Sequence, residues 1–208
     1  TGAYRISLES GFADTGPYAS ACEVLLRRPP RRAAGIEGPL HRPDESASAA
    51  LVRLCGELAG GMLPVQGPPG AGKTTKGAQA ILALAAAGKT IGVTAVSHKV
   101  IDNLLEAVRD AAPSSNPVQN VRLVHKPGDG EAPPGIEYIK STDTVLNSIA
   151  PSTVVGGTAW LWAHANAIGK LDYLIVDEAG QMALAQVLAA ARAARNLGLL
   201  GDPPQLEQ

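Results

Sequence analysis

Gly67-Pro68-Pro69-Gly70-Ala71-Gly72-Lys73-Thr74 fits the pattern G-x-x-x-x-G-K-[ST] of a phosphate-binding loop. A short apolar run over 63–65 precedes this loop, and a helical stretch over 72–87 follows it. Glycines let backbone N–H groups turn inward around an anion, at a helix N-terminus that carries partial positive charge. The alternative is a glycine-rich turn that binds nothing, which the strand and helix on either side disfavour. The segment therefore predicts a loop that holds phosphates.

A second segment, Tyr173-Leu174-Ile175-Val176-Asp177-Glu178, is an apolar run that ends in two carboxylates. A buried parallel strand that ends in Asp places the carboxylate at the C-terminal edge of the sheet, where ligands bind. We expect Asp177 and the Thr74 hydroxyl to hold Mg²⁺, and Lys73 to reach the β- and γ-phosphates. Glu178 would orient or deprotonate water. Asp-Glu is also a common helix start, but the phosphate loop favours function, and the acidic pair favours a hydrolase over a kinase.

The rest of the chain alternates short apolar runs with helical stretches. A first helix, capped by Asp44 or Ser46, ends before Gly60. Strands that are apolar throughout and separated by helices indicate an α/β domain, with a parallel sheet flanked by helices on both faces. The predicted strands cover 62–66, 90–95, 121–125, 153–155, 173–176 and 196–200, the later helices 72–87, 98–111, 159–168 and 180–194, and the surface loops 113–120 and 127–135.

Residues 1–44 are the least regular part of the sequence. They contain a possible strand over 4–8, a possible helix over 19–26 and the run Arg27-Arg28-Pro29-Pro30-Arg31-Arg32. Prolines remove backbone donors and glycines add entropy, so we interpret 1–44 as a linker or the remnant of a preceding domain. A nucleic-acid contact is the alternative role for the arginines. The domain boundary is predicted at residue 45.

Composition narrows the class of protein. The chain has 208 residues, 45% of them hydrophobic, which suits one folded domain and excludes a fully disordered chain. The two cysteines, Cys22 and Cys55, exclude a disulfide framework and a four-cysteine metal site. No long apolar run and no signal peptide are present, so we expect a cytoplasmic protein without a membrane partner. The net charge of -1 argues against a strongly electrostatic nucleic-acid binder.

Three motifs occur in a recognisable order. Together, Gln66 to Thr74, Asp177-Glu178-Ala179 and Gly201-Asp202-Pro203-Pro204-Gln205-Leu206 resemble motifs I, II and III of superfamily 1 helicases. The segment Thr94 to Leu104, with its Ser97-His98-Lys99 core, resembles motif Ia of the 1B branch. This form of motif Ia is similar to bacterial proteins that fuse a RecB-like nuclease to a helicase. The resemblance covers about residues 45–208.

The resemblance implies a P-loop NTPase (RecA-like) domain, the first of two motor domains of a DNA or RNA helicase. It implies catalytic roles for Lys73, Glu178 and Gln205, with the amide of Gln205 touching the γ-phosphate. Ser97, His98 and Thr158 would contact single-stranded nucleic acid, DNA more than RNA. The cofactors would be ATP and Mg²⁺, with ATP held by Gln66, Gly67, Pro68, Pro69, Gly70, Ala71, Gly72, Lys73, Thr74 and Thr75.

The resemblance also implies a second RecA-like domain that supplies an arginine finger. The sequence stops shortly after Leu206 and lacks an initiator Met, so we expect a piece of a larger helicase or nuclease–helicase with weak activity by itself. Two alternatives stay open. One is another P-loop ATPase that acts as a switch, and the other is a nucleotide-binding domain without turnover.

Overall fold

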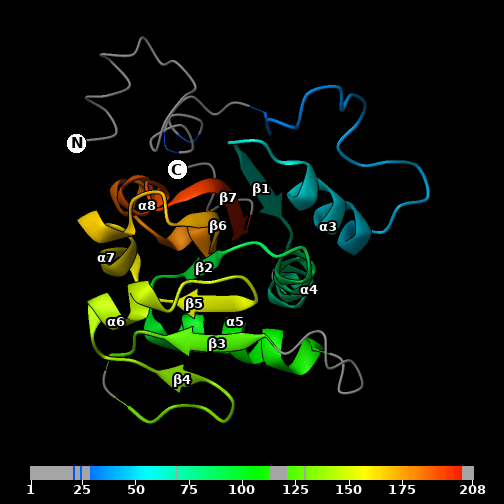
Figure 1. Cartoon of the computed structure of the whole chain (residues 1–208). Coiled ribbons are helices and arrows are strands. Elements are labelled where there is room, and N and C mark those ends of the chain that lie inside the picture. The colour runs from blue at the N-terminus through cyan, green and yellow to red at the C-terminus, as the bar shows by residue number, and fades with distance from the viewer. Residues whose placement is uncertain are drawn as a thin grey trace, which may run out of the picture.

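The computed structural model describes residues 21, 24, 29–68, 70–112, 121–128 and 130–202. Its elements alternate between helix and strand along the chain (Figure 1). In order they are α3 (Ala47–Glu57), β1 (Met62–Gln66), α4 (Lys73–Ala86), β2 (Ile91–Thr94), α5 (His98–Ala111), β3 (Arg122–His125), β4 (Glu137–Tyr138), α6 (Thr142–Asn147), β5 (Thr153–Gly156), α7 (Ala159–Trp162), η2 (Ala165–Ala167), β6 (Leu171–Val176), η3 (Ala179–Gln181), α8 (Leu184–Ala191) and β7 (Ala194–Gly201).

The strands form one seven-stranded sheet in the order β1-β7-β6-β2-β5-β3-β4. Every neighbouring pair is parallel. This confirms the predicted α/β class. The last strand, β7, lies between β1 and β6, as expected if the segment after β7 is to meet the phosphate loop. The C-terminal ends of β1, β6 and β7 therefore share one edge of the sheet.

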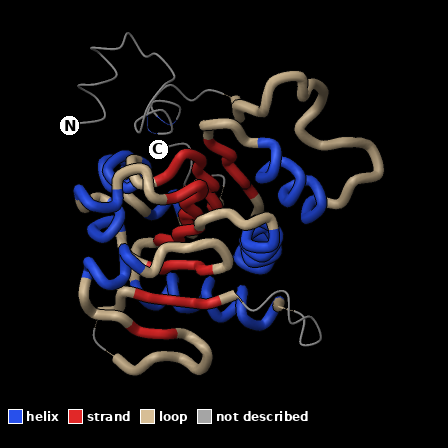
Figure 2. The backbone as a smooth tube through the Cα atoms, viewed as in Figure 1, coloured by secondary structure: helices blue, strands red, loops and turns tan. Residues whose placement is uncertain are grey.

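Helices cover both faces of the sheet (Figures 1 and 2). One core cluster joins α3, α4 and α5 to the sheet through residues such as Leu54, Ile81 and Leu105. The other joins α6, α7 and α8 to the opposite face through residues such as Trp162 and Val187. Burial of these two apolar faces is the main force that holds the helices against the sheet. Among the described residues, no helix is long and apolar enough to cross a membrane.

Two local features set the ends and the packing of the helices around the site. Serine side chains accept a backbone N–H at the start of α3 (Ser46) and of α5 (Ser97), as helix caps do. Gly77 in α4 lies against β7, since a Cβ there would come within 2.6 Å of Leu200 Cδ1. The absence of a side chain at Gly77 lets α4, and with it the phosphate loop, approach the end of β7.

Two predicted helices are shorter in the structure. The helix expected over 159–168 ends at Trp162, whose indole Nε1 donates to Val93 O (3.1 Å) and Gly157 O (3.0 Å). A 3₁₀ turn, η2, follows. The helix expected over 180–194 splits into η3 and α8, and β7 already begins at Ala194. Asn196 fixes that strand, because its side chain accepts from Gly60 N (2.8 Å) and donates to Asp172 O (3.1 Å). Tertiary hydrogen bonds override helix propensity at both places.

The structure differs from the other sequence predictions in two short elements, and some predicted segments lie outside the described residues. The short elements β4 and α6 were not predicted, and the two segments 113–120 and 4–8 lie outside the described residues. The same holds for most of 19–26. The part of the predicted linker from residue 29 onward lies against α3. Arg53 of α3 donates to Leu40 O (2.7 Å), and Ala33 N donates to Glu57 O at the end of α3 (2.8 Å).

Candidate nucleotide site

The phosphate loop joins β1 to α4, and its backbone follows the glycines. Gly70 (φ 76°) and Gly72 (φ 70°) adopt the left-handed conformation that side chains disfavour. Lys73, the first residue of α4, donates from Nζ to Gly67 O (2.8 Å) and Pro68 O (2.9 Å). The same ammonium group forms an ion pair with Asp202, just after β7. Lys73 is thus folded over its own loop and paired with a carboxylate that follows another strand.

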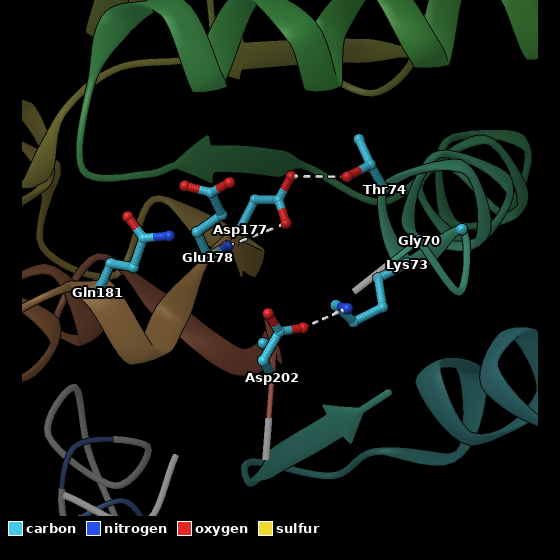
Figure 3. A pocket seen from close by; sticks show the side chains of 9 residues that line it. Gly70, Lys73, Thr74, Asp177, Glu178, Gln181 and Asp202 are labelled. Carbon is cyan, nitrogen blue, oxygen red and sulfur yellow. Dashed lines mark hydrogen bonds and ion pairs between the residues drawn. The ribbon is translucent and has the colours of Figure 1, made fainter. Parts of the chain in front are cut away.

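Asp177, just after β6, is hydrogen-bonded to Thr74 of α4. The Thr74 hydroxyl donates to Asp177 Oδ2 at 3.2 Å, and the backbone N–H of Glu178 donates to Asp177 Oδ1 at 3.0 Å (Figure 3). Asp177 is 4% exposed, and burial raises the pKa of its carboxyl above the usual range, against the opposing effect of these two hydrogen bonds and of Lys73. One carboxylate beside one hydroxyl at a phosphate loop fits Mg²⁺, which takes few protein ligands and completes its shell with phosphates and waters.

Glu178 occupies an unusual backbone conformation. Its φ of 49° lies in the left-handed region, which costs free energy for a residue with a side chain. Burial raises the pKa of its carboxyl, and the negative charges of Asp177 and Asp202 raise it further. A carboxylate with a raised pKa accepts a proton more readily near neutral pH, which is the property that a general base requires.

These side chains converge on one cavity of about 380 Å³ (Figure 3). The cavity collects groups from four segments that are far apart in the sequence: the phosphate loop with the start of α4, the end of β6, η3 and the end of β7. Its lining residues are Gly70, Gly72, Lys73, Thr74, Asp177, Glu178, Gln181, Gly201 and Asp202. The structure thus brings together the predicted phosphate, metal and base residues.

Besides Gly201, two lining residues had no role in the sequence prediction. Asp202 stands in the motif III segment, but the sequence does not say that its carboxylate reaches Lys73. Gln181 comes three residues after Glu178, and η3 turns it into the cavity. Its position just beyond the acidic pair was the one available signal. Both residues contribute polar groups to the lining of the cavity.

The other predicted ATP contacts lie around the cavity rather than in its lining. Gly67 and Pro68 contribute the carbonyls that hold Lys73, and Ala71 O accepts from Lys76 Nζ (2.9 Å). Gln66 ends β1, and Thr75 is exposed on the first turn of α4. Pro69 and Gln205 lie outside the described residues. The roles of all these residues stay predictions.

The three residues predicted to contact single-stranded nucleic acid lie at the same edge of the sheet as the cavity. Ser97 caps α5 just beyond β2, and its Oγ accepts from Val100 N at 3.3 Å. Thr158 starts α7 just beyond β5, and its side chain makes no capping hydrogen bond. Since β2 and β5 are parallel neighbours, both residues lie at adjacent strand ends. His98, however, turns toward β3, where its Nδ1 lies 3.1 Å from His125 Nε2.

Comparisons with known proteins agree with this geometry. The family model of the AAA domain matches residues 48–208. The DNA replication ATP-dependent helicase/nuclease DNA2 of Saccharomyces cerevisiae is 30% identical over 150 residues, covering 68% of this chain and 10% of the relative. Its namesake in Schizosaccharomyces pombe is 27% identical over 150 residues, with the same coverage. The chain spans about a tenth of the length of these curated relatives. It belongs to the AAA domain family, as a RecA-like domain of the superfamily 1 helicases.

Proposed function

We propose that this chain binds ATP with Mg²⁺ and hydrolyses it, as the first motor domain of a DNA helicase. The observation that carries the proposal is the convergence of Lys73, the Thr74–Asp177 pair and Glu178 on one cavity. The printed names of both relatives, DNA replication helicase/nucleases, support DNA as the substrate. They also support our proposal that the chain is part of a longer helicase or nuclease–helicase.

Phosphate binding would exchange the partners of Lys73. Its ammonium group is held in the structure by Asp202 and by two loop carbonyls. Phosphate oxygens at the N-terminus of α4 compete for that charge and also accept from the loop N–H groups. Mg²⁺, when bound, neutralises phosphate charge, and Thr74 and Asp177 are the residues that would hold it. The ion pair between Lys73 and Asp202 would then give way to contacts between Lys73 and phosphate.

Hydrolysis would depend on Glu178. Its carboxyl lines the cavity beside Asp177, and its pKa is raised by burial and by its acidic neighbours. We propose that it orients a water molecule toward the γ-phosphate and takes the proton of that water as the new P–O bond forms. Gln205 would contact the γ-phosphate. A second RecA-like domain would supply the arginine that stabilises the transition-state charge.

The nucleic-acid strand would cross the same sheet edge at Ser97, His98 and Thr158. Hydroxyl, imidazole and backbone groups at strand ends suit phosphates in a sequence-independent groove. Because the whole chain carries a net charge of -1, we expect weak affinity that decreases as salt rises. Tight, salt-insensitive binding would contradict this assignment.

The proposal is tested with Glu178→Gln. An amide cannot accept the proton of water, so ATP affinity should persist while turnover drops by at least about 10²-fold, the size typical of a lost general base. Glu131→Gln, on an exposed loop, is the matched control and should leave the rate unchanged. Nucleotide affinity is measured by calorimetry, and turnover by release of radiolabelled phosphate. Unchanged turnover in Glu178→Gln would rule out Glu178 as the base.

A further inference from the structure

Four side chains form a hydrogen-bonded series, which we call the relay. It runs from β4 to the sheet edge where we propose that nucleic acid binds. The Tyr138 hydroxyl donates to Asp102 Oδ2 (2.7 Å), and Asp102 Oδ1 lies 2.7 Å from His125 Nδ1. The other nitrogen of that ring, Nε2, lies 3.1 Å from His98 Nδ1. Tyr138 is on β4, His125 on β3, and Asp102 and His98 are on α5, which pack together at one end of the sheet (Figure 1). The nucleotide cavity uses none of these residues.

The middle of this series of four side chains is buried and contains one carboxylate, Asp102. His125 is 0% exposed, and burial lowers the pKa of its imidazole, against the opposing effect of Asp102. Asp102 and Glu106, both on α5, are the acids whose charges act on the Tyr138 hydroxyl, and Glu137 of β4 is paired with Arg122 at 2.6 Å. Gly156 of β5 adds no charge. Asp102 is the one acid among them that touches an imidazole.

The carboxylate fixes where the ring protons lie. Asp102 accepts the Tyr138 proton, and its other oxygen requires a proton on His125 Nδ1. In a neutral His125 ring, Nε2 then carries a lone pair, so it must accept the proton of His98 Nδ1. A neutral His98 is therefore held as the Nδ1–H tautomer, and its outer nitrogen, Nε2, is an acceptor.

Adding one proton to the two rings changes the outer nitrogen, His98 Nε2, from a hydrogen-bond acceptor into a donor. If the proton stays on His98, Nε2 becomes a charged donor. If the proton between the rings shifts to His125, His98 becomes the Nε2–H tautomer, and Nε2 is again a donor. The pair accepts one proton in total, because two N–H groups cannot point at each other across 3.1 Å.

The outer edge of His98 lies beside a glycine. Gly128 lies against it, and a Cβ at this glycine would come within 2.9 Å of His98 Cδ2 and 3.3 Å of Nε2. His98 itself is partly exposed, and it opens the 14-residue helix α5, whose N-terminal end favours a negative charge. A side chain at position 128 would crowd Nε2, and the glycine avoids that clash at the sheet edge.

We propose that Tyr138, Asp102 and His125 act as positioning residues that make His98 a proton-gated contact for a backbone phosphate of the bound strand. This inference rests on the proposed strand binding at the sheet edge. A protonated pair presents Nε2–H to the phosphate. A neutral pair presents a lone pair to it and repels it. Affinity for the nucleic-acid strand therefore rises as the pH falls and the His98–His125 pair takes up a proton.

The test measures affinity for a fluorescein-labelled single-stranded DNA oligonucleotide at fixed salt between pH 5.5 and 8. For the wild-type chain we expect about tenfold tighter binding at the acidic end, the size of one charge-assisted hydrogen bond to phosphate. His98→Gln removes this dependence. Asp102→Asn removes the charge that favours the added proton, so the change in affinity moves to lower pH. His41→Gln, at an exposed histidine far from the relay in sequence, keeps the wild-type profile.

A second readout needs no DNA. Imidazole ¹⁵N NMR of the free chain should show both His98 and His125 as Nδ1–H tautomers at pH 8. A neutral His125 with its proton on Nε2 would overturn the relay. DNA binding that is equally tight at pH 6 and pH 8 would also overturn it and leave strand binding standing. No binding at any pH would overturn strand binding itself, and with it this inference.

Discussion

Asp177 illustrates how a single functional residue can reduce the stability of the free domain. Its carboxylate is buried at the end of β6 and receives one hydroxyl and one backbone hydrogen bond. Burial still raises its pKa, so the charged form is less favourable in the folded chain than in the unfolded one. A bound metal ion would reverse that balance, which fits the proposed role of Asp177 in holding Mg²⁺.

Asp177→Asn should therefore stabilise the free chain and weaken Mg²⁺-dependent nucleotide binding. Because the folded-state pKa is raised, the contribution of Asp177 to stability is present in acid and lost as the pH rises through that pKa. Near neutral pH we expect the variant to gain about 1 kcal/mol, since Thr74 can rotate its hydroxyl to face an amide. Thermal unfolding at pH 4 and pH 7 checks this.

The control for this comparison is Asp110→Asn, at an exposed carboxylate on α5, which should change stability little at either pH. The account of Asp177 would be wrong if Asp177→Asn unfolded at a lower temperature than the wild type at pH 7.

At the scale of elements, the contact between α4 and β7 sets the position of the phosphate loop. Gly77 leaves room for Leu200, which is buried at 2% exposure near the end of β7. The same strand carries Asp202 toward Lys73 two residues later. A larger side chain at Gly77 would push the start of α4 away from this strand, and with it the loop and Lys73.

Gly77→Val should destabilise the domain by about 1–3 kcal/mol, the usual cost of overpacking a core. Leu200→Ala in the same chain removes the clashing methyl groups, so the two substitutions together should cost less than the sum of their separate effects. Denaturant titrations of the two single variants and the double variant measure this coupling. Additive free energies of unfolding would contradict the proposed contact.

The sequence predicted those elements that carry local signals and missed those decided by distant contacts. Ser97 caps the predicted helix 98–111, and the structure starts and ends it at the same residues. The ends of α7 and α8 depend on Trp162 and Asn196, whose partners lie on other strands. The site divides in the same way. Lys73 and Asp177 stand in motifs, whereas the pairing of Lys73 with Asp202 depends on the order of β1 and β7 in the sheet.

At the scale of the whole molecule, the nucleotide cavity and the proposed strand contacts share one sheet edge, and in the proposed helicase a second domain would close over it. The chain by itself should therefore hydrolyse ATP slowly, because a missing arginine finger costs about 10³–10⁵ in rate. Steady-state turnover with and without single-stranded DNA measures this. Fast turnover that the strand stimulates would show that this chain contains a complete catalytic site.

The most direct test of the central claim, that this cavity is an ATP site, is a calorimetric titration of the chain with ATP and Mg²⁺. We compare the wild type with Lys73→Ala and use Lys89→Ala, on the turn after α4, as the control. The wild type and the control should bind one nucleotide per chain. Lys73→Ala should lose most of the affinity, because the phosphates lose a charge-assisted partner at the start of α4. Equal affinity in Lys73→Ala, or no binding by the wild type, would contradict the account.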